Sequence, residues 1–167
     1  MGYVHYTDSP IGRIIITGEE DALTGLRFEG QKDHAGTLYN NHFNIAEKHL
    51  PVFVEAERWL DLYFAGRDPG FIPKLAPDGT VFQKEIWEML LTIPFGETRS
   101  YGDIASIIAG RRGIRSFSAQ AVGGAVGRNP ISLIIPCHRV VGADGSLTGY
   151  AGGLGRKEYL LKMERSL

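Results

Sequence analysis

The sequence is poor in cysteine, since its 167 residues include only Cys137. A single thiol cannot close a disulfide within the chain, so the composition is typical of a reducing compartment, and we expect the cytoplasm. One cysteine and five scattered histidines also argue against a structural zinc site. We therefore expect no metal and no cofactor.

Long apolar runs are also missing, because no stretch approaches the roughly 20 residues of a membrane-spanning helix. The N-terminus, MGYVHYTDSPIGRI, has no basic segment followed by an apolar one, so we expect no secretory signal. Hydrophobic residues make up 43% and charged residues 22% of the chain, which is ordinary for a globular protein with a buried core. We expect no membrane partner, and a monomer, since no pattern indicates an oligomer.

Charge is unevenly distributed, although the net charge is only −1. Residues 1–96 carry 8 Lys/Arg and 14 Asp/Glu, whereas residues 97–167 carry 10 Lys/Arg and 5 Asp/Glu. A basic half suits an anionic partner, of which nucleic acid is the usual large one. A chance distribution of solvated charge would give the same numbers, so charge alone leaves both interpretations open.

The first half of the chain predicts strands followed by a helix. Three β-branched or aromatic runs, YVHYT (3–7), RIIITG (from Arg13) and ALTGLRF (22–28), are separated by turn-like DSPIG and GEED. This pattern predicts an antiparallel meander. A helix is predicted from Pro51 to just before Gly66, whereas residues 29–46 carry no clear signal. Three prolines in 68–79 predict a linker between domains at 1–78 and 80–167.

The second half predicts mainly helices. Thr80 and Gln83 can form a capping box for a helix over 81–93, and Ser100 can cap a second helix that ends before Gly110. A basic loop, GRRGIR, then leads to a short helix over 118–126, so that this pair resembles a helix-turn-helix. Residues 131–135 are predicted to be extended, and LGRKEYLLKMERSL is predicted to form a closing amphipathic helix.

The helix predicted over 118–126 is unusually rich in small residues. Gly123 and Gly124 lie in its middle, each at a cost of roughly 1 kcal/mol relative to alanine, and Ala121 is also small. Such a surface suits close packing against another helix, or entry into a narrow DNA groove with basic side chains on the phosphates. The basic residues that flank it are Arg111, Arg112, Arg115 and Arg128.

Cys137 lies in the stretch IIPCHRVV, residues 134–141. A thiol is nucleophilic as the thiolate, and a neighbouring histidine such as His138 can take its proton. A carboxylate can then hold the imidazole in the required tautomer, and Glu164 is a candidate whose reach the sequence does not show. Most free cysteines are instead small buried hydrophobic residues, and the Cys-His pair alone favours that interpretation.

Four stretches together, NPISLIIPCHRVV, YGDIA, AVGGAV and GYAGGL, resemble the O6-alkylguanine-DNA alkyltransferases, also called methylated-DNA–protein-cysteine methyltransferases. The resemblance is strong over 80–167 and looser over 1–78. It implies an α+β fold: a ribonuclease-H-like antiparallel sheet plus helix, then a mainly helical, winged helix-turn-helix-like domain that carries the cysteine. It also implies double-stranded DNA with O6-alkylguanine as the partner, base flipping, and irreversible transfer of the alkyl group to Cys137 in a single turnover, with O4-alkylthymine as a further possible substrate.

The resemblance also assigns residues to roles. Cys137 accepts the alkyl group, His138 takes its proton through a water, and Glu164 orients His138. Asn129 holds the turn before the cysteine, and Tyr101 rotates the nucleotide and donates to the flipped base. The remaining implied contacts are Val126, Val140, Tyr150 and Ala151 around the flipped base, and Gln120, Ala121, Gly123, Gly124 and Arg128 along the DNA.

Two departures from the family pattern affect these expectations. Gln120 stands where the family usually has arginine, and the turn before it is longer and rich in arginine. We therefore expect Arg111, Arg112 or Arg115 to supply some of the missing charge. Ser132 stands where some relatives have proline, which predicts an altered tolerance for bulky alkyl groups.

Three other functions compete with alkyl transfer. A sensor that binds alkylated DNA without repairing it would lack the acceptor cysteine, and Cys137 is present. A transcription factor would use the helix-turn-helix without needing a thiol in this context. A cysteine hydrolase would need an oxyanion hole and turnover on an acyl substrate.

Overall fold

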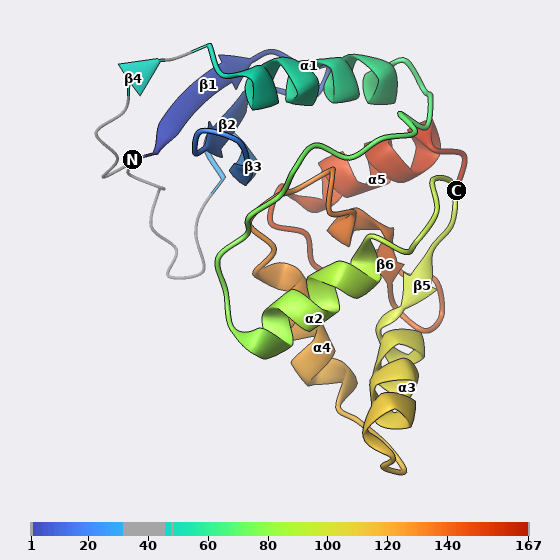
Figure 1. The fold of residues 1–167 in the computed structure, drawn as a ribbon. Coiled ribbons are helices and arrows are strands. Elements are labelled where there is room, and N and C mark those ends of the chain that lie inside the picture. The colour runs from blue at the N-terminus through green and yellow to red at the C-terminus, as the bar shows by residue number, and fades with distance from the viewer. Residues whose placement is uncertain (1, 32–45, 48, 167) are drawn as a thin grey trace. The chain divides into compact units, whose positions relative to one another are not determined.

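The computed structural model describes residues 2–31, 46–47 and 49–166, which form two compact units (Figure 1). The first unit runs to Asp78 and also takes in Pro130–Ile134, and the second contains Gly79–Asn129 and the chain from Ile135 onward. Residues 130–134, which the sequence analysis placed in the second domain, join the first unit because their backbone pairs with one of its strands. No helix in the described part of the chain is long and apolar enough to cross a membrane.

The first unit is built on a four-stranded sheet with the order β3-β2-β1-β4. Strands β1 (Tyr3–Thr7), β2 (Ile14–Gly18) and β3 (Leu23–Phe28) are antiparallel, which confirms the predicted meander. Strand β4 (Ala46–Glu47) pairs in parallel with β1 and comes from a segment for which the sequence carried no clear signal. The other residues of that segment from 32 to 45 lie outside the described part.

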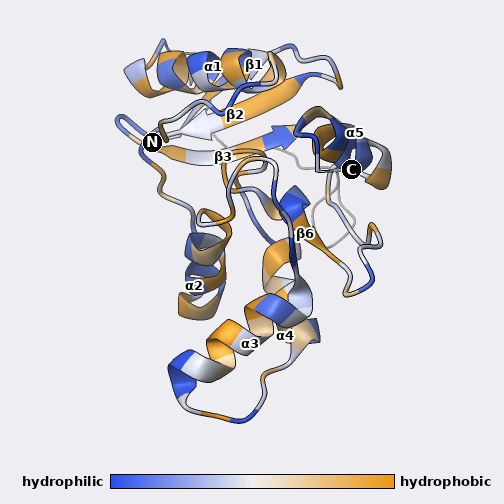
Figure 2. Cartoon of the chain, turned by 90° about the vertical axis from the view of Figure 1, so that its right-hand side faces the viewer, coloured by the Kyte–Doolittle hydropathy of each residue, from blue (hydrophilic) through white to orange (hydrophobic). Residues whose placement is uncertain are grey.

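Helix α1 (Pro51–Phe64) packs on this sheet and confirms the helix predicted from Pro51 to just before Gly66. Proline is favoured in the first turn because it has no N–H to leave unsatisfied. The buried side chains of α1 are Val52, Phe53, Ala56, Trp59, Leu60 and Tyr63. Figure 2 shows that β2 is made mainly of hydrophobic residues, and Ile14 and Ile16 on it are fully buried. Burial of each large apolar side chain contributes about 1.5–3 kcal/mol.

The predicted linker at 68–79 is not a free connection. Leu23 of β3 donates its N–H to the carbonyl of Lys74 at 2.8 Å, and Ala76 donates to the carbonyl of Leu23 at 2.7 Å. Prolines are tolerated at the edge of a sheet, because there a missing N–H leaves no pairing broken. Much of the segment therefore belongs to the first unit.

The extended conformation predicted for 131–135 is found only at Ile131, which bridges to Leu26 of β3. The N–H of Ser132 donates to the carbonyl of Leu26 at 2.9 Å, and the chain then turns. Leu133 has a φ of 70°, which no strand residue adopts. The prediction of an extended conformation over the whole run was therefore wrong, because a buried apolar run does not distinguish an extended segment from a buried turn.

The second unit begins with helix α2 (Val81–Leu90), capped as predicted by Thr80 and Gln83. The indole N–H of Trp87 donates to the carbonyl of Ala125 at 2.9 Å in the interior. This bond fixes α2 against the fourth helix, α4 (Ala119–Gly127), which is capped by Ser118. The small residues of α4 thus serve at least in part for close helix packing.

Helix α3 (Tyr101–Arg112) is capped by Ser100 and Asp103 but is longer than predicted. Gly110 lies within the helix, where a glycine costs roughly 1 kcal/mol without ending it. The helix ends at Gly113, whose φ of 64° is the left-handed conformation favoured at this position. In the GRRGIR stretch, only the residues from Gly113 onward are therefore loop, and the turn to α4 spans 113–118.

The rest of the second unit positions the cysteine. A one-turn helix, η1 (Cys137–Arg139), leads into β6 (Val140–Val141), which pairs in parallel with β5 (Arg99–Ser100). Helix α5 (Leu154–Met163) closes the chain as predicted. Glu164 directly follows α5, at its C-terminal cap.

Candidate active site

Cys137 opens the short helix η1 and is 7% exposed. Burial raises the pKa of its thiol, while a hydrogen bond with Asn129 and the positive charge of Lys157 act in the opposite direction. Because the net direction is upward, the resting group is the thiol rather than the thiolate. A nucleophilic reaction at this sulfur therefore requires a base to take the proton.

His138 supplies a base that is itself held in place. Its Nε2 lies 2.6 Å from Oε2 of Glu164, and the imidazole is fully buried. Burial lowers the pKa of His138, although the adjacent carboxylate raises it, so the ring is neutral near pH 7. With Nε2–H donating to the carboxylate, Nδ1 is the nitrogen that can accept a proton.

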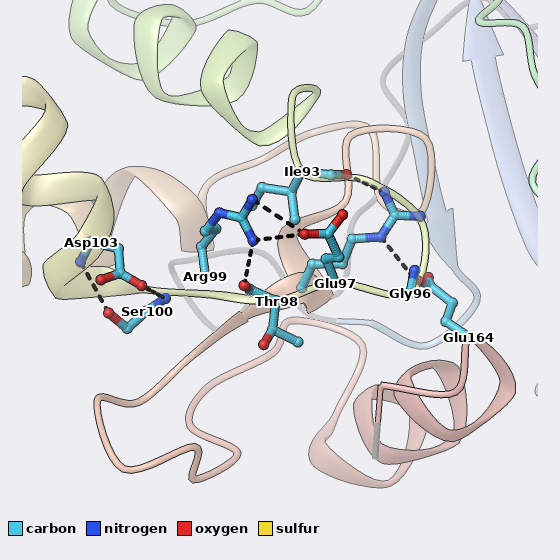
Figure 3. A network of polar contacts seen from close by, with 9 residues as sticks. Ile93, Gly96, Glu97, Thr98, Arg99, Ser100, Asp103 and Glu164 are labelled. Carbon is cyan, nitrogen blue, oxygen red and sulfur yellow. Dashed lines mark hydrogen bonds and ion pairs between the residues drawn. The ribbon is translucent and has the colours of Figure 1, made fainter.

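Glu164 is fixed at both of its oxygens. Oε1 accepts from Nε of Arg139 at 2.8 Å and from the backbone N–H of Gly96 at 3.1 Å, a contact drawn in Figure 3. Burial alone would raise the pKa of Glu164, but hydrogen bonds from His138 and Arg139 lower it to about 2. Arg139 is held in turn by the carbonyl of Ile93, 2.7 Å from its Nη1. The carboxylate is therefore charged throughout the physiological range and stabilises an imidazolium at His138.

Asn129 follows the end of α4 and is buried beside the cysteine. Its Nδ2 donates to the carbonyl of Ile135 at 2.8 Å. That carbonyl also accepts from the backbone N–H of Cys137 at 2.8 Å. The side chain thus closes the turn that presents the sulfur.

The loop after β6 brings an aromatic ring to the imidazole of His138. The Tyr150 ring lies edge-on to His138, with ring centroids 6.4 Å apart, and Ala151 beside it is exposed. Tyr101, at the start of α3, donates its hydroxyl to the carbonyl of Thr148 at 3.3 Å. A Cβ placed on Gly123 would lie 3.6 Å from the Tyr101 ring, an ordinary van der Waals distance, so an alanine would also fit between α3 and α4 at this position.

Helix α4 has one buried and one exposed face. Val126 is buried, as is Val140 on β6. The exposed face includes four of the residues expected at the DNA: Gln120, Ala121, Gly124 and Arg128. Ser132 belongs instead to the first unit, where its backbone pairs with Leu26.

The three arginines expected to supply charge have different surroundings. Arg112 donates to Glu85 at 3.2 Å, and its guanidinium lies 4.8 Å from the centre of the Phe117 ring. Arg111 lies 3.7 Å from Glu85, a longer exposed ion pair. Arg115 lies in the turn itself and is exposed. Arg112 therefore holds the turn to α2.

Two buried charged residues near the cysteine were not predicted from the sequence. Arg139 fixes Glu164, and Lys157 on α5 is fully buried and bonded to three backbone carbonyls. A signal for Lys157 was present, because it lies three, four and seven residues before Leu160, Leu161 and Glu164, on one helical face. A lysine on a buried stripe requires partners in the interior.

The described residues show no group of three or more His, Cys, Asp or Glu side chains that could hold a metal ion. The site itself contains a buried thiol, a neutral base with a fixed tautomer, and a charged carboxylate behind the base.

Comparison with known proteins identifies the family. Residues 3–75 match the 6-O-methylguanine DNA methyltransferase ribonuclease-like domain, and residues 81–166 match the DNA-binding domain of the same proteins. The chain belongs to the 6-O-methylguanine DNA methyltransferase family. Both parts of the α+β fold expected from the sequence are thereby confirmed.

Relatives in this family match over nearly the whole chain. The methylated-DNA–protein-cysteine methyltransferase of Methanosarcina acetivorans is 46% identical over 98% of this chain and 99% of its own. That of Mycobacterium leprae is 47% identical, over 95% and 89% respectively. The solved structure of the Mycobacterium tuberculosis OGT in complex with DNA is 43% identical and superposes with a TM-score of 0.80, over 98% of this chain and 93% of its own.

Proposed function

We propose that this methyltransferase-family protein repairs double-stranded DNA by direct reversal, moving the alkyl group from guanine O6 to its own Cys137. The observation that carries the proposal is the buried thiol followed at once by His138, whose Nε2 lies 2.6 Å from Glu164. The family membership and the DNA complex of the M. tuberculosis relative support the choice of substrate.

The transfer is a displacement at the alkyl carbon. His138 takes the proton of the Cys137 thiol through a water, and the thiolate attacks the carbon. The S–C bond forms as the C–O6 bond breaks. The guanine that leaves gains one proton, which equals in number the proton that His138 took from the thiol. Because a thioether is a stable product and no group here regenerates the thiol, each molecule acts once.

The expected contacts around the flipped base are assigned to the loop, β6 and α4. Backbone groups of Cys137 and Val140 read the guanine edge, the N–H of Ala151 faces O6, and Tyr150 and Val126 line the alkyl pocket. The hydroxyl of Tyr101, now on the Thr148 carbonyl, turns to the base when DNA binds. Ser132 is proposed to adjust the tolerance for larger alkyl groups.

The exposed face of α4 is the proposed DNA-binding surface. Gly124 and Ala121 allow the helix to approach the groove closely, and Gln120 hydrogen-bonds the base left unpaired by flipping. Arg128 and Arg115 meet phosphates on either side of the helix. A lone thiol of this kind stays reduced in the cytoplasm, where we place the protein, acting as a monomer.

Intact-protein mass spectrometry tests the proposal directly. The protein is mixed with a duplex that holds one O6-methylguanine, and a stoichiometric gain of one methylene on Cys137 is expected. Cys137→Ser is the matched control and should gain nothing. Tight binding without mass gain in the wild-type protein would instead indicate a sensor that does not repair.

A further inference from the structure

Lys157 lies on the buried face of α5, and none of its surface is exposed. Its neighbours on that face are Leu160 and Leu161, both fully buried. An ammonium group in such surroundings is strongly unfavourable unless hydrogen bonds satisfy it. The mechanism above does not use this residue.

The contacts of Lys157 join two segments beside the thiol. Its Nζ donates to the carbonyl of Val140 at 2.6 Å, of Thr148 at 2.8 Å and of Gly149 at 3.3 Å. An ammonium group has three N–H donors and no acceptor, so three carbonyls match it completely. Val140 is on β6, three residues after Cys137, and the other two carbonyls directly precede Tyr150.

The loop that this ammonium holds carries groups assigned to the alkyl pocket. The Tyr150 ring lies edge-on to His138, and Ala151 follows it. Gly149 and Gly153 bracket these residues with φ values of 46° and 95°, conformations that favour glycine. Glycine leaves the backbone conformationally free, so an outside contact is needed to keep the loop in one position.

We propose that Lys157 is a positioning residue for alkyl transfer, tying the loop that carries Tyr150 and Ala151 to strand β6. The inference rests on the proposed function, because the loop matters through its place at the alkyl pocket. Lys157 acts on the reaction through the loop and touches no reacting atom.

The tether depends on the charge of the amine. Burial lowers the pKa of Lys157 to about 8, and the Cys137 thiolate acts in the opposite direction. The titratable groups that interact with it are Cys137 and His138. Below pH 8 the ammonium offers three donors. Above it the neutral amine offers two, so one carbonyl contact is lost and the loop is held less firmly.

The test compares Lys157→Met, Lys157→Arg and the control Lys162→Met. Lys162 is on the same helix, is exposed and pairs with Glu158 at 2.9 Å. Single-turnover transfer from the O6-methylguanine duplex is followed by mass from pH 6 to 10, and hydrogen exchange is measured for amides 149–153. We expect Lys157→Met to slow transfer by about 100-fold, the cost of a misplacement near 1 Å, and to speed exchange in the loop.

Lys157→Arg stays charged and should therefore transfer the alkyl group much faster than Lys157→Met. The wild-type rate should fall above pH 8, whereas the rate of Lys157→Arg should not. A Lys157→Met rate equal to that of Lys162→Met would overturn the proposal, and so would slowed transfer with unchanged loop exchange. If Lys157→Met does not fold, Lys157→Gln, which retains N–H donors without the charge, replaces it under the same criteria. If the wild type transfers no alkyl group, the proposed function fails, while loop exchange still tests the tether.

Discussion

His138 and Glu164 share a hydrogen bond of 2.6 Å between Nε2 and Oε2, and neither side chain has any exposed surface. The bond joins a helix of one turn to the end of the last helix, 26 residues later. Because Arg139 and Gly96 occupy the other carboxylate oxygen, Glu164 cannot rotate away without losing further bonds. The imidazole tautomer is therefore set by tertiary structure.

Glu164→Gln should slow alkyl transfer by about 100-fold or more, because general-base catalysis by His138, which contributes at least that much, depends on this carboxylate. The amide keeps the shape of the side chain but removes the charge that stabilises the imidazolium. Single-turnover mass spectrometry measures the rate. Glu158→Gln, an exposed change on the same helix, is the control and should match the wild type.

Acid should destabilise the fold through Glu164. Its pKa falls from 4.5 to about 2 on folding, so its stabilisation is complete above pH 4.5 and is lost as the pH falls towards 2. A shift of this size corresponds to about 3 kcal/mol in the free energy of unfolding. Denaturant unfolding at several pH values measures the free energy of unfolding of the wild type and of Glu164→Gln. The difference between the two should shrink as the pH falls from 4.5 towards 2. A difference that stays constant with pH would contradict the lowered pKa of Glu164.

Asn129→Ala should destabilise the fold and make the thiol less acidic. The substitution removes one of the two donors to the buried carbonyl of Ile135, at a cost of about 1 kcal/mol, because the backbone N–H of Cys137 remains. It also removes a hydrogen bond that lowers the pKa of Cys137. The rate of reaction with iodoacetamide against pH reports the second effect, and an unchanged profile would show that Asn129 acts only on the turn.

Arg115→Ala and Arg112→Ala should have different effects. Loss of a phosphate contact at Arg115 should reduce the magnitude of the slope of log affinity against log salt concentration by about 0.9, with stability unchanged.

Arg112→Ala should lower the free energy of unfolding by about 1 kcal/mol, because Arg112 lies over the Phe117 ring and pairs with Glu85. Affinity measurements at several salt concentrations and thermal unfolding separate the two effects. Arg67→Ala, in the first unit, is the control. If replacing all three arginines, Arg111 included, changes neither affinity nor slope, none of them contacts DNA.

Local signals in the sequence predicted elements reliably where one residue decides the outcome. Thr80 and Ser100 start their helices because each side chain caps a backbone N–H three residues on. The end of α3 was misplaced because two glycines, Gly110 and Gly113, both resemble a stop. The left-handed conformation is taken by Gly113 and not by Gly110.

The run 131–135 shows a second limit of local pattern. Its four apolar side chains, Ile131, Leu133, Ile134 and Ile135, are all buried. They do not predict that Ile131 pairs with β3 while Leu133 turns, because the partner strand lies over 100 residues earlier in the chain. The same holds for segment 68–79, whose prolines suggest a linker although β3 binds it.

The sequence by itself determined the chemistry of this protein: one thiol, a histidine beside it, and motifs in the order typical of the family. Only the tertiary structure decided which charges serve that chemistry. Glu164, Arg139 and Lys157 lie far apart along the chain or look like ordinary solvated residues. They became parts of the site because burying a charge is unfavourable unless the fold brings it a partner, and those partners come from distant segments.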